Sequence, residues 1–340
     1  MFFIKKKDFL NIFYQIGNFS LIRYLMKPYQ GKAAILMYHR ILPHEERARD
    51  KSPNANLIVS LRRFEEQMRF LSNNYKLISM DEIPEYLISG KDFAVAITFD
   101  DGYKDNLTFA LPILKKYNVP ATIYLSTRFP EKDCGIWWYE LAEICDARKW
   151  ISFVWEDKKY NIPLKTPSQK KRGFRKLRRF ILSLDVTGKN SILDILRQGE
   201  KPRDYSDLCL TWDEIRLLDS EPLITIGAHT HSHCNLSTLS LSEAEFEINK
   251  SILLLEKNLG HKIYHFSFPY GKVDEACVRE YEIGKKFGFR TAVTTIFSAL
   301  NQNSNLHCLP RSLVREEDDV FNLKVKLSGW ETFVRTKLKV

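Results

Sequence analysis

Short apolar runs recur along the chain, and amphipathic segments of helical length separate them. Within each run the hydrophobic residues are nearly continuous rather than alternating, which is typical of strands buried on both faces of a parallel sheet. The predicted strands span residues 34–38, 93–99, 121–125, 223–227, 264–268, 291–295 and 306–309.

Helices are predicted between these strands at 62–73, 106–117, 241–259 and 274–287, and Gly260 and Gly288 follow the last two as C-terminal caps. The alternation of strand and helix predicts an α/β fold. Its seven units in a chain of 340 residues indicate a distorted TIM-like (β/α)7 barrel, either complete or with part of its wall missing.

The alternation of predicted strands and helices is interrupted between about residues 130 and 205, where four of the six tryptophans lie. A tract from 165 to 179 in this stretch holds many lysines and arginines and no acid. We interpret the stretch as an insertion into a barrel that spans 31–315. An amphipathic segment at 1–30 and a helical tail at 316–340 flank the barrel. The basic tract is either a solvated helix face or a surface for an anionic lipid or a phosphate-bearing glycan carrier.

The net charge of +10 and the pI near 9.1 favour anionic partners such as membrane surfaces, nucleic acid or phosphorylated substrates. The six cysteines are scattered without a Cys-x-x-Cys pair, which favours reduced thiols over a disulfide framework. No secretion signal and no apolar run of membrane-spanning length is evident. We therefore expect a cytoplasmic protein.

Residues 9–26 carry aromatic and aliphatic side chains at helical spacing, after three consecutive lysines at 5–7. Such a segment can lie on an anionic membrane surface. The simpler interpretation is a helix that packs against the body of the protein. The first interpretation predicts peripheral binding at the inner face of the cytoplasmic membrane.

Reactive side chains follow the carboxyl ends of the predicted strands. In a parallel barrel these ends share one face, where active sites form. The residues concerned are His39 after the first strand, Asp100 and Asp101 after the second, His229 and His233 after the fourth, Pro269 and Tyr270 after the fifth, and Arg311 after the last.

Adjacent carboxylates at 100 and 101 diverge, so that one can bind a metal while the other accepts a proton. His229 and His233 are four residues apart, which would place both imidazoles on one face of a helical turn. With one aspartate they make a three-ligand site that leaves a position for water. Singly, these residues are as consistent with a turn, a cap or a surface position, but their shared placement at strand ends favours a metal hydrolase.

Three short sequences resemble the motifs of the polysaccharide deacetylase superfamily, the NodB-like domain of carbohydrate esterase family four. Thr-Phe-Asp-Asp-Gly at 98–102 resembles the first motif, and Gly-Ala-His-Thr-His-Ser-His at 227–233 resembles the second. Phe-Ser-Phe-Pro-Tyr-Gly at 266–271 resembles the third motif in the branch that carries Phe-x-Tyr-Pro-Tyr-Gly. Residues 36–40, 64–68 and 288–292 also resemble that branch.

The resemblance implies a divalent metal, most commonly Zn²⁺, and hydrolysis of N-acetyl groups on amino sugars. By motif, Asp100 is the general base and Asp101, His229 and His233 bind the metal. The backbone N–H of Tyr270, next to Pro269, stabilises the oxyanion together with the metal. His39 is assigned as the general acid, and the alternative is a structural histidine that bonds the loop backbone.

Two features depart from the family pattern. Related enzymes carry an arginine in the third motif that orients the catalytic aspartate, and Ser267 occupies that position here. No Leu-x-Ile-x-x-His segment, which supplies the acid in many members, is present. Arg311 either supports Asp100 or forms an ordinary surface salt bridge.

The sequence thus predicts a metal-dependent de-N-acetylase. Its substrate would be an N-acetylated glycan, or a lipid-linked or nucleotide-linked sugar of surface polysaccharide assembly. One alternative is a catalytically inactive carbohydrate-binding relative, which would have no need for a second aspartate. The other is a nucleic-acid-binding protein, which the charge suggests but which leaves the metal-ligand pattern unexplained, so nucleic acid is not expected as a partner.

Overall fold

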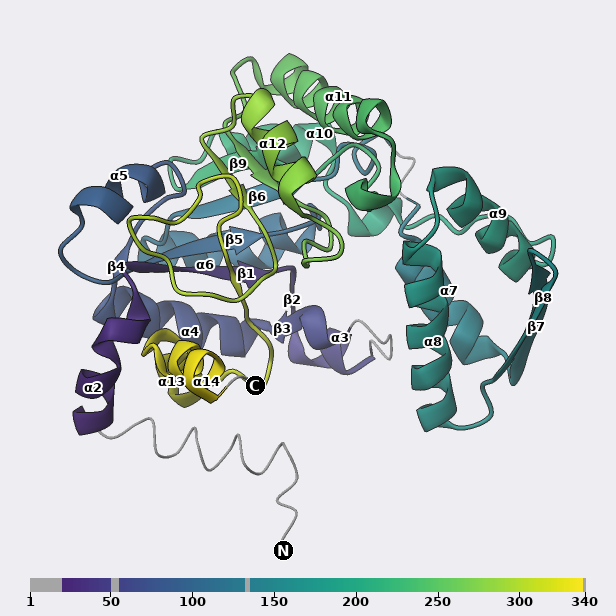
Figure 1. The fold of residues 1–340 in the computed structure, drawn as a ribbon, viewed down its shortest axis with the longest axis horizontal. Coiled ribbons are helices and arrows are strands. Elements are labelled where there is room, and N and C mark those ends of the chain that lie inside the picture. Colours follow the sequence, from purple (N-terminus) through teal and green to yellow (C-terminus); the bar gives the residue numbers. More distant parts are fainter. Residues whose placement is uncertain (1–19, 50–54, 132–134, 339–340) are drawn as a thin grey trace, which may run out of the picture.

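The computed structural model describes residues 20–49, 55–131 and 135–338. Its centre is a sheet of eight parallel strands in the order β11-β10-β9-β6-β5-β1-β12, with β4 paired to β5 (Figure 1). The α/β prediction is therefore confirmed. The strands are β1 (Ala33–Tyr38), β4 (Lys76–Leu77), β5 (Ala94–Phe99), β6 (Ala121–Leu125), β9 (Ile224–Ala228), β10 (His265–Ser267), β11 (Thr291–Val293) and β12 (Ser312–Leu313).

One chain segment joins the two edges of this sheet. Leu309 forms a parallel bridge to Val293 of β11, and its amide donates to the carbonyl of Ala292 at 2.9 Å. Three residues later, Ser312 pairs with Leu36 of β1. The predicted strand at 306–309 is wrong, because the chain crosses from one edge to the other here and forms only an isolated bridge at Leu309. The strands β11 and β12 at the two edges do not pair with each other, so the barrel wall is incomplete. The crossing segment spans the gap between them.

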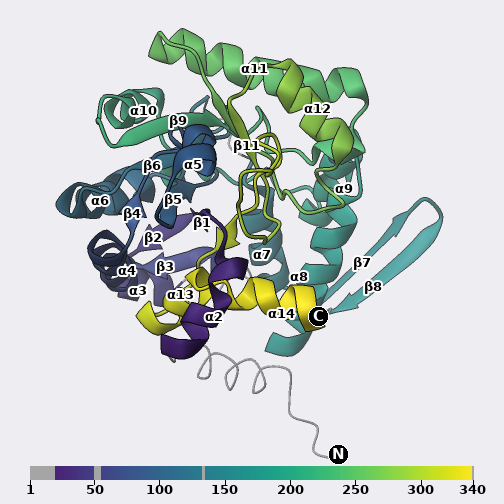
Figure 2. The ribbon, with the colours of Figure 1, turned by 60° about the vertical axis from the view of Figure 1, so that its left-hand side comes forward.

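Helices cover the outside of the sheet, and a continuous cluster of aliphatic and aromatic side chains lies between the two layers (Figure 2). Two predicted helices agree with the structure to within one residue. The predicted helix at 106–117 instead begins with a π-helical turn, and that at 274–287 begins only at Val278. The helices of the barrel are α4 (Leu61–Asn74), α5 (Ile83–Ser89), η2 (Asn106–Ala110) with α6 (Leu111–Tyr117), α10 (Trp212–Asp219), α11 (Leu241–Leu259) and α12 (Val278–Lys286).

Smaller elements fill the remaining connections. Two short parallel strands pair beside the barrel. A short helix and three 3-10 turns also lie outside the inserted lobe. These elements are β2 (Arg40–Leu42), β3 (Ile58–Ser60), α3 (His44–Arg49), η1 (Ala55–Leu57), η3 (Ser206–Leu208) and η4 (Leu236–Thr238).

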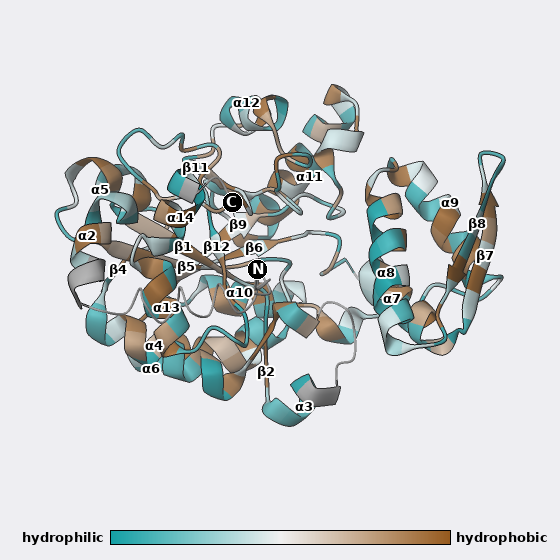
Figure 3. Ribbon diagram, turned by 60° about the horizontal axis from the view of Figure 1, so that its bottom comes forward, coloured by the Kyte–Doolittle hydropathy of each residue, from teal (hydrophilic) through white to brown (hydrophobic). Residues whose placement is uncertain are grey.

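The insertion forms a lobe beside the barrel, with a hydrophobic cluster of its own (Figure 1). It consists of α7 (Trp137–Ala147), the antiparallel hairpin β7 (Trp150–Trp155) and β8 (Lys158–Pro163), α8 (Pro167–Leu182) and α9 (Val186–Arg197). The basic tract lies on α8, which buries Phe174, Leu177 and Ile181 toward the lobe. Hydrophilic and hydrophobic residues therefore alternate along this helix in Figure 3.

The ends of the described chain pack on each other (Figure 2). The helix α2 (Ser20–Gln30) contacts α14 (Trp330–Leu338) through the rings of Tyr29 and Phe333, whose centroids are 5.0 Å apart. Gln30 also donates to the carbonyl of Leu327, the last residue of α13 (Val320–Leu327), at 2.8 Å. The described part of the segment 1–30 is thus a packed helix, and the lysines at 5–7 lie outside the described residues. None of the helices described combines the length and the apolar character needed to cross a bilayer.

Candidate active site

The residues singled out at the strand ends come together at one face of the sheet. Asp100 and Asp101 follow β5 directly, His229 follows β9, and Arg311 precedes β12. All of these side chains are buried. Charged groups that are this buried must be paired or hold an ion, because an isolated charge away from water is very costly.

Three of these side chains converge as donors for a metal. One atom each from Asp101, His229 and His233 lies within 4.8 Å of the other two. The Nε2 atoms of His233 and His229 are 3.0 and 3.4 Å from the same carboxylate oxygen, Oδ1 of Asp101. One carboxylate and two imidazoles form a donor set that suits a divalent first-row ion, so the residues present fit the expected metal.

The opposite ring nitrogens fix the orientation of the two imidazoles. Nδ1 of His229 donates to the carbonyl oxygen of Ser267 at 2.7 Å, and Nδ1 of His233 lies 3.2 Å from the hydroxyl of Tyr270. Such partners set the tautomer that leaves Nε2 free for a metal. Burial lowers the pKa of His233 more than the charge of Asp101 raises it, which favours the neutral imidazole that a ligand requires.

The backbone that carries the histidines is not the predicted helical turn. Residues after β9 form an irregular loop in which Thr230 and His233 have φ of 62° and 51°. Gly227 before this loop lies so close to Tyr124 that an added Cβ would fall 2.5 Å from its ring. The prediction of a helical turn was wrong because four-residue spacing is only one of several ways to bring two imidazoles together.

Asp101 also has a positive φ, of 79°. This conformation turns its side chain away from that of Asp100, although the two residues are adjacent. Non-glycine residues in the left-handed region are strained by about 1–3 kcal/mol and collect at functional sites. The divergence expected for the two carboxylates is therefore present, at a cost in backbone strain.

Asp100 is held by Arg311 rather than directed at the histidines. The guanidinium donates to both carboxylate oxygens, at 2.7 and 2.6 Å, and also donates to the hydroxyls of Thr98 and Ser267. Only 1% of Arg311 is exposed, so the surface salt bridge considered as an alternative is wrong. Burial by itself would raise the pKa of Asp100, but the charges of Arg311 and then of His229 outweigh it and hold this pKa below its usual value.

This arrangement accounts for the departure at position 267. The guanidinium that the resemblance would place in the third motif comes here from Arg311, on the segment that closes the barrel. The hydroxyl of Ser267 accepts a hydrogen bond from it at 2.8 Å. An arginine thus orients Asp100 from a different part of the sequence.

His39 lies directly after β1, close enough to both aspartates for its charge to contribute to their lowered pKa values. Its carbonyl oxygen accepts from Asn106 at 2.9 Å. Its Nδ1 is buried and has no hydrogen-bond partner among the residues that the structure describes. A free ring nitrogen beside the two aspartates is compatible with proton transfer, and its role as the acid stays a prediction.

The amide of Tyr270 is available at the same face. Tyr270 follows Pro269 with φ of 62°, and no acceptor for its backbone N–H lies within the described parts of the chain. Thr295 donates to the carbonyl of Tyr270 at 2.6 Å, which fixes the turn. This geometry leaves a donor for an oxyanion, and the role itself remains predicted.

Two contacts from the insertion reach the site and were not predicted. The ring of Trp138 on α7 lies 4.7 Å from that of His233, between centroids. Arg40, after β1, is buried with Asp105 at 2.7 Å and also donates to the hydroxyl of Tyr139 on α7 at 2.7 Å. Arg40 lies within the segment 36–40 that resembles the family branch, whereas no local pattern in the sequence pointed to Trp138.

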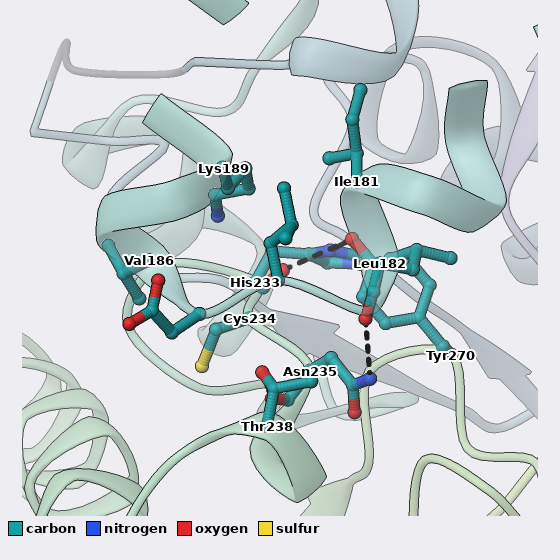
Figure 4. A pocket seen from close by; sticks show the side chains of 11 residues that line it. Ile181, Leu182, Val186, Lys189, His233, Cys234, Asn235, Thr238 and Tyr270 are labelled. Carbon is teal, nitrogen blue, oxygen red and sulfur yellow. Dashed lines mark hydrogen bonds between the residues drawn. The ribbon is translucent and has the colours of Figure 1, made fainter. Parts of the chain in front are cut away.

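A hollow lies between the insertion and the loop after His233 (Figure 4). Lys189 of α9 lines it together with His233 and Tyr270. Burial lowers the pKa of Lys189; the charge of Arg128 adds to this, and Glu247 acts in the opposite direction. The hollow thus brings a half-buried cation next to a candidate metal ligand.

Comparison with known proteins decides the family. Residues 88–292, more than half of the chain, match the polysaccharide deacetylase family. The chain belongs to the polysaccharide deacetylase family. The predicted family is therefore confirmed.

The individual relatives of this polysaccharide deacetylase are either similar over only a short stretch or have low sequence identity. The putative polysaccharide deacetylase YxkH of Bacillus subtilis is 39% identical over 99 residues, which are 28% of this chain and 32% of that protein, so the chain spans about a third of this relative. The poly-beta-1,6-N-acetyl-D-glucosamine N-deacetylase of Staphylococcus aureus is 25% identical over 82% of this chain and 73% of its own length. The Streptococcus pyogenes deacetylase PplD, solved in complex with acetate, shares the fold with a TM-score of 0.58 at 21% identity, over 87% of this chain and 98% of its own.

Proposed function

We propose that this polysaccharide deacetylase is a zinc-dependent hydrolase that removes the acetyl group from an N-acetylated amino sugar of a glycan. The observation that supports the proposal is that two adjacent carboxylates, those of Asp100 and Asp101, have different partners. Asp101 lies with two imidazoles as a three-donor set, while Asp100 is turned away and held by Arg311. A protein that only bound carbohydrate would not need this second, oriented carboxylate.

Oδ1 of Asp101 and the Nε2 atoms of His229 and His233 would hold the ion. Zn²⁺ in such a site supplies Lewis-acid chemistry when bound, since it polarises a carbonyl group and makes water more acidic. The protein's own part is to fix the donors, through the carbonyl of Ser267 behind His229 and the hydroxyl of Tyr270 behind His233.

Proton transfers fall to Asp100 and His39. Asp100 accepts the proton of the attacking water, and its lowered pKa keeps it ionised at neutral pH. Each of its oxygens retains a lone pair after bonding Arg311, so the salt bridge orients the base without blocking it. His39 then donates a proton to the departing amine, and acetate and a free amino sugar result.

The amide N–H of Tyr270 donates to the oxygen of the acetyl group as negative charge develops there. We take the substrate to be an N-acetylglucosamine-containing polysaccharide, or its lipid-linked or nucleotide-linked precursor. The named activity of the staphylococcal relative supports the first of these.

The test is acetate release from N-acetylated oligosaccharides, lipid-phosphate sugars and nucleotide sugars, with the zinc-loaded protein and with Asp100→Asn. We expect the substitution to lower kcat by about 10²–10⁴-fold, the usual contribution of a general base. Asp81→Asn, an aspartate outside the site, is the matched control and should retain activity. Release that survives in Asp100→Asn, or binding of glycan without any release by the wild type, would contradict the proposal.

A further inference from the structure

One cation of the basic tract differs from its neighbours in where it lies. Arg178 of α8 is half-buried, and its guanidinium carbon sits 5.6 Å from the centroid of the Tyr270 ring. Most other cations of the tract are exposed on the outer face of α8, among them Arg175 and Arg179. Arg178 alone among them, in the described chain, contacts a residue of the active site.

A second cation, on the next helix, lines a hollow that Tyr270 also lines. Lys189 of α9 lines the hollow that ends at His233 and Tyr270, and Figure 4 shows its amine pointing from the helix into this hollow. Within the described ranges, neither Lys189 nor Arg178 has a carboxylate at ion-pair distance. A half-buried amine without a counter-charge is unfavourable, and an anion from outside would relieve it.

Asp185 and Glu247, two acidic groups close to Lys189, already accept hydrogen bonds from other groups. Asp185, which lines the same hollow, accepts from the amide of Gly188 at 2.7 Å and caps α9. Glu247 accepts from the amide and the hydroxyl of Ser232, at 2.8 and 2.9 Å. The charge of Arg128 adds to the positive potential at Lys189.

We propose that Lys189 and Arg178 form an anion subsite beside the candidate metal ligands. The subsite binds a phosphate or carboxylate group that the glycan carries next to the sugar being deacetylated. Arginine offers a planar fork that matches either oxyanion, and lysine adds a point charge. Both cations come from the insertion, so the insertion selects substrates while the barrel performs the reaction.

This inference rests on the proposed deacetylation, and the experiment separates the two. Acetate release is measured on a neutral N-acetylglucosamine disaccharide, on the same disaccharide bearing a phosphodiester, and on one with an adjacent uronic acid. The variants are Lys189→Met, Arg178→Gln and their combination. Arg175→Gln and Arg179→Gln remove exposed cations of the same helix as matched controls, and Lys189→Arg keeps the charge.

We expect the wild type to favour an anionic over the neutral disaccharide by about tenfold or more in kcat/KM, the order of one charged hydrogen bond. The double variant should lose this preference, mainly through KM, while Lys189→Arg and the two control variants keep it. Comparison of the phosphate and uronic acid substrates identifies the oxyanion. Arg178→Gln keeps the test available if Lys189→Met does not fold.

Three results would overturn the inference. These are a wild type without any anion preference, a double variant that retains it, and control variants that lose it equally, which would indicate a general field of the basic surface. Calorimetric binding of the phosphodiester disaccharide to wild type and double variant decides the question even if no substrate releases acetate. If no substrate releases acetate but the wild type binds the phosphodiester disaccharide more tightly than the double variant, the proposed function is refuted and the anion subsite is not.

Discussion

Two aspartate–histidine contacts of equal length lie in this sheet, and they differ in what they can do. His233 approaches Asp101 at 3.0 Å beyond the carboxyl end of the strands, and His265 approaches Asp81 at 3.0 Å at the amino end of β10. At the amino end both ring nitrogens of His265 are used, because Nδ1 also bonds the hydroxyl of Thr291 at 2.8 Å. His265 therefore has no ring nitrogen left that could bind a metal ion.

At the carboxyl end, two imidazole Nε2 atoms converge on a single carboxylate oxygen. The aspartates also differ in burial, since the side chain of Asp101 is 7% exposed and that of Asp81 is 42% exposed. Converging donors that are buried away from water therefore mark the candidate metal site, whereas an isolated, half-exposed contact is a structural hydrogen bond. Residue type alone does not separate the two.

The largest expected difference between the contacts of Asp101 and of Asp81 is in metal binding. Asp101→Ala removes one of three ligands and should abolish stoichiometric zinc, measured by elemental analysis after dialysis against a weak chelator. Asp81→Ala removes the equivalent contact from His265 and should leave the zinc content unchanged. Equal zinc in both variants would show that the ion, if bound, lies elsewhere.

Two arginines that contact Asp100 and Asp81 differ in the same way. Arg311 is fully buried on Asp100, and Arg290 bonds Asp81 at 3.0 Å with 45% of its side chain exposed. Removing one partner of a buried pair costs about 3–5 kcal/mol, and an exposed pair is worth about 1 kcal/mol or less. Arg311→Met should therefore lower the free energy of unfolding far more than Arg290→Met, as measured by urea denaturation.

Arg311→Met should also shift the pH dependence of the reaction. Arg311 lowers the pKa of Asp100 against the effect of burial, so its loss raises this pKa. The acid limb of kcat/KM then moves to higher pH, and Arg290→Met should not move it. In the wild type, the lowered pKa contributes stability above the ordinary value of about 3.9, and this is lost as the pH falls through the folded value. An unshifted acid limb in Arg311→Met would mean that Asp100 is not the base.

The same contrast explains what the sequence could predict. Buried strands and the residues that follow them are local signals, so the sheet, its carboxyl-end face and the aspartates at 100 and 101 were predictable. The partner of Asp100 was not settled, because Arg311 lies 211 positions away and only the fold brings the two together. The left-handed conformation of His233 was likewise not predictable, since the four-residue spacing of the histidines does not fix the backbone between them.

The insertion was recognised only as a break in the pattern. Its helices and hairpin bury their apolar side chains against one another, so they form a cluster separate from that of the barrel. No motif marked Trp138, Arg178 or Lys189, because their position relative to the site depends on how this lobe packs against the barrel loops. Composition showed that cations were abundant there, but not which of them face the site.

The smallest expected effect concerns the atoms behind the two histidines. Tyr270→Phe removes the hydroxyl 3.2 Å from Nδ1 of His233 and should weaken zinc binding by about tenfold, the low end for such supporting contacts. Thr291→Val removes the hydroxyl behind His265 and should leave zinc affinity unchanged. Competition titration with a chromophoric chelator measures both. If neither variant changes the affinity, the loop backbone and the carbonyl of Ser267 suffice to orient the ligands.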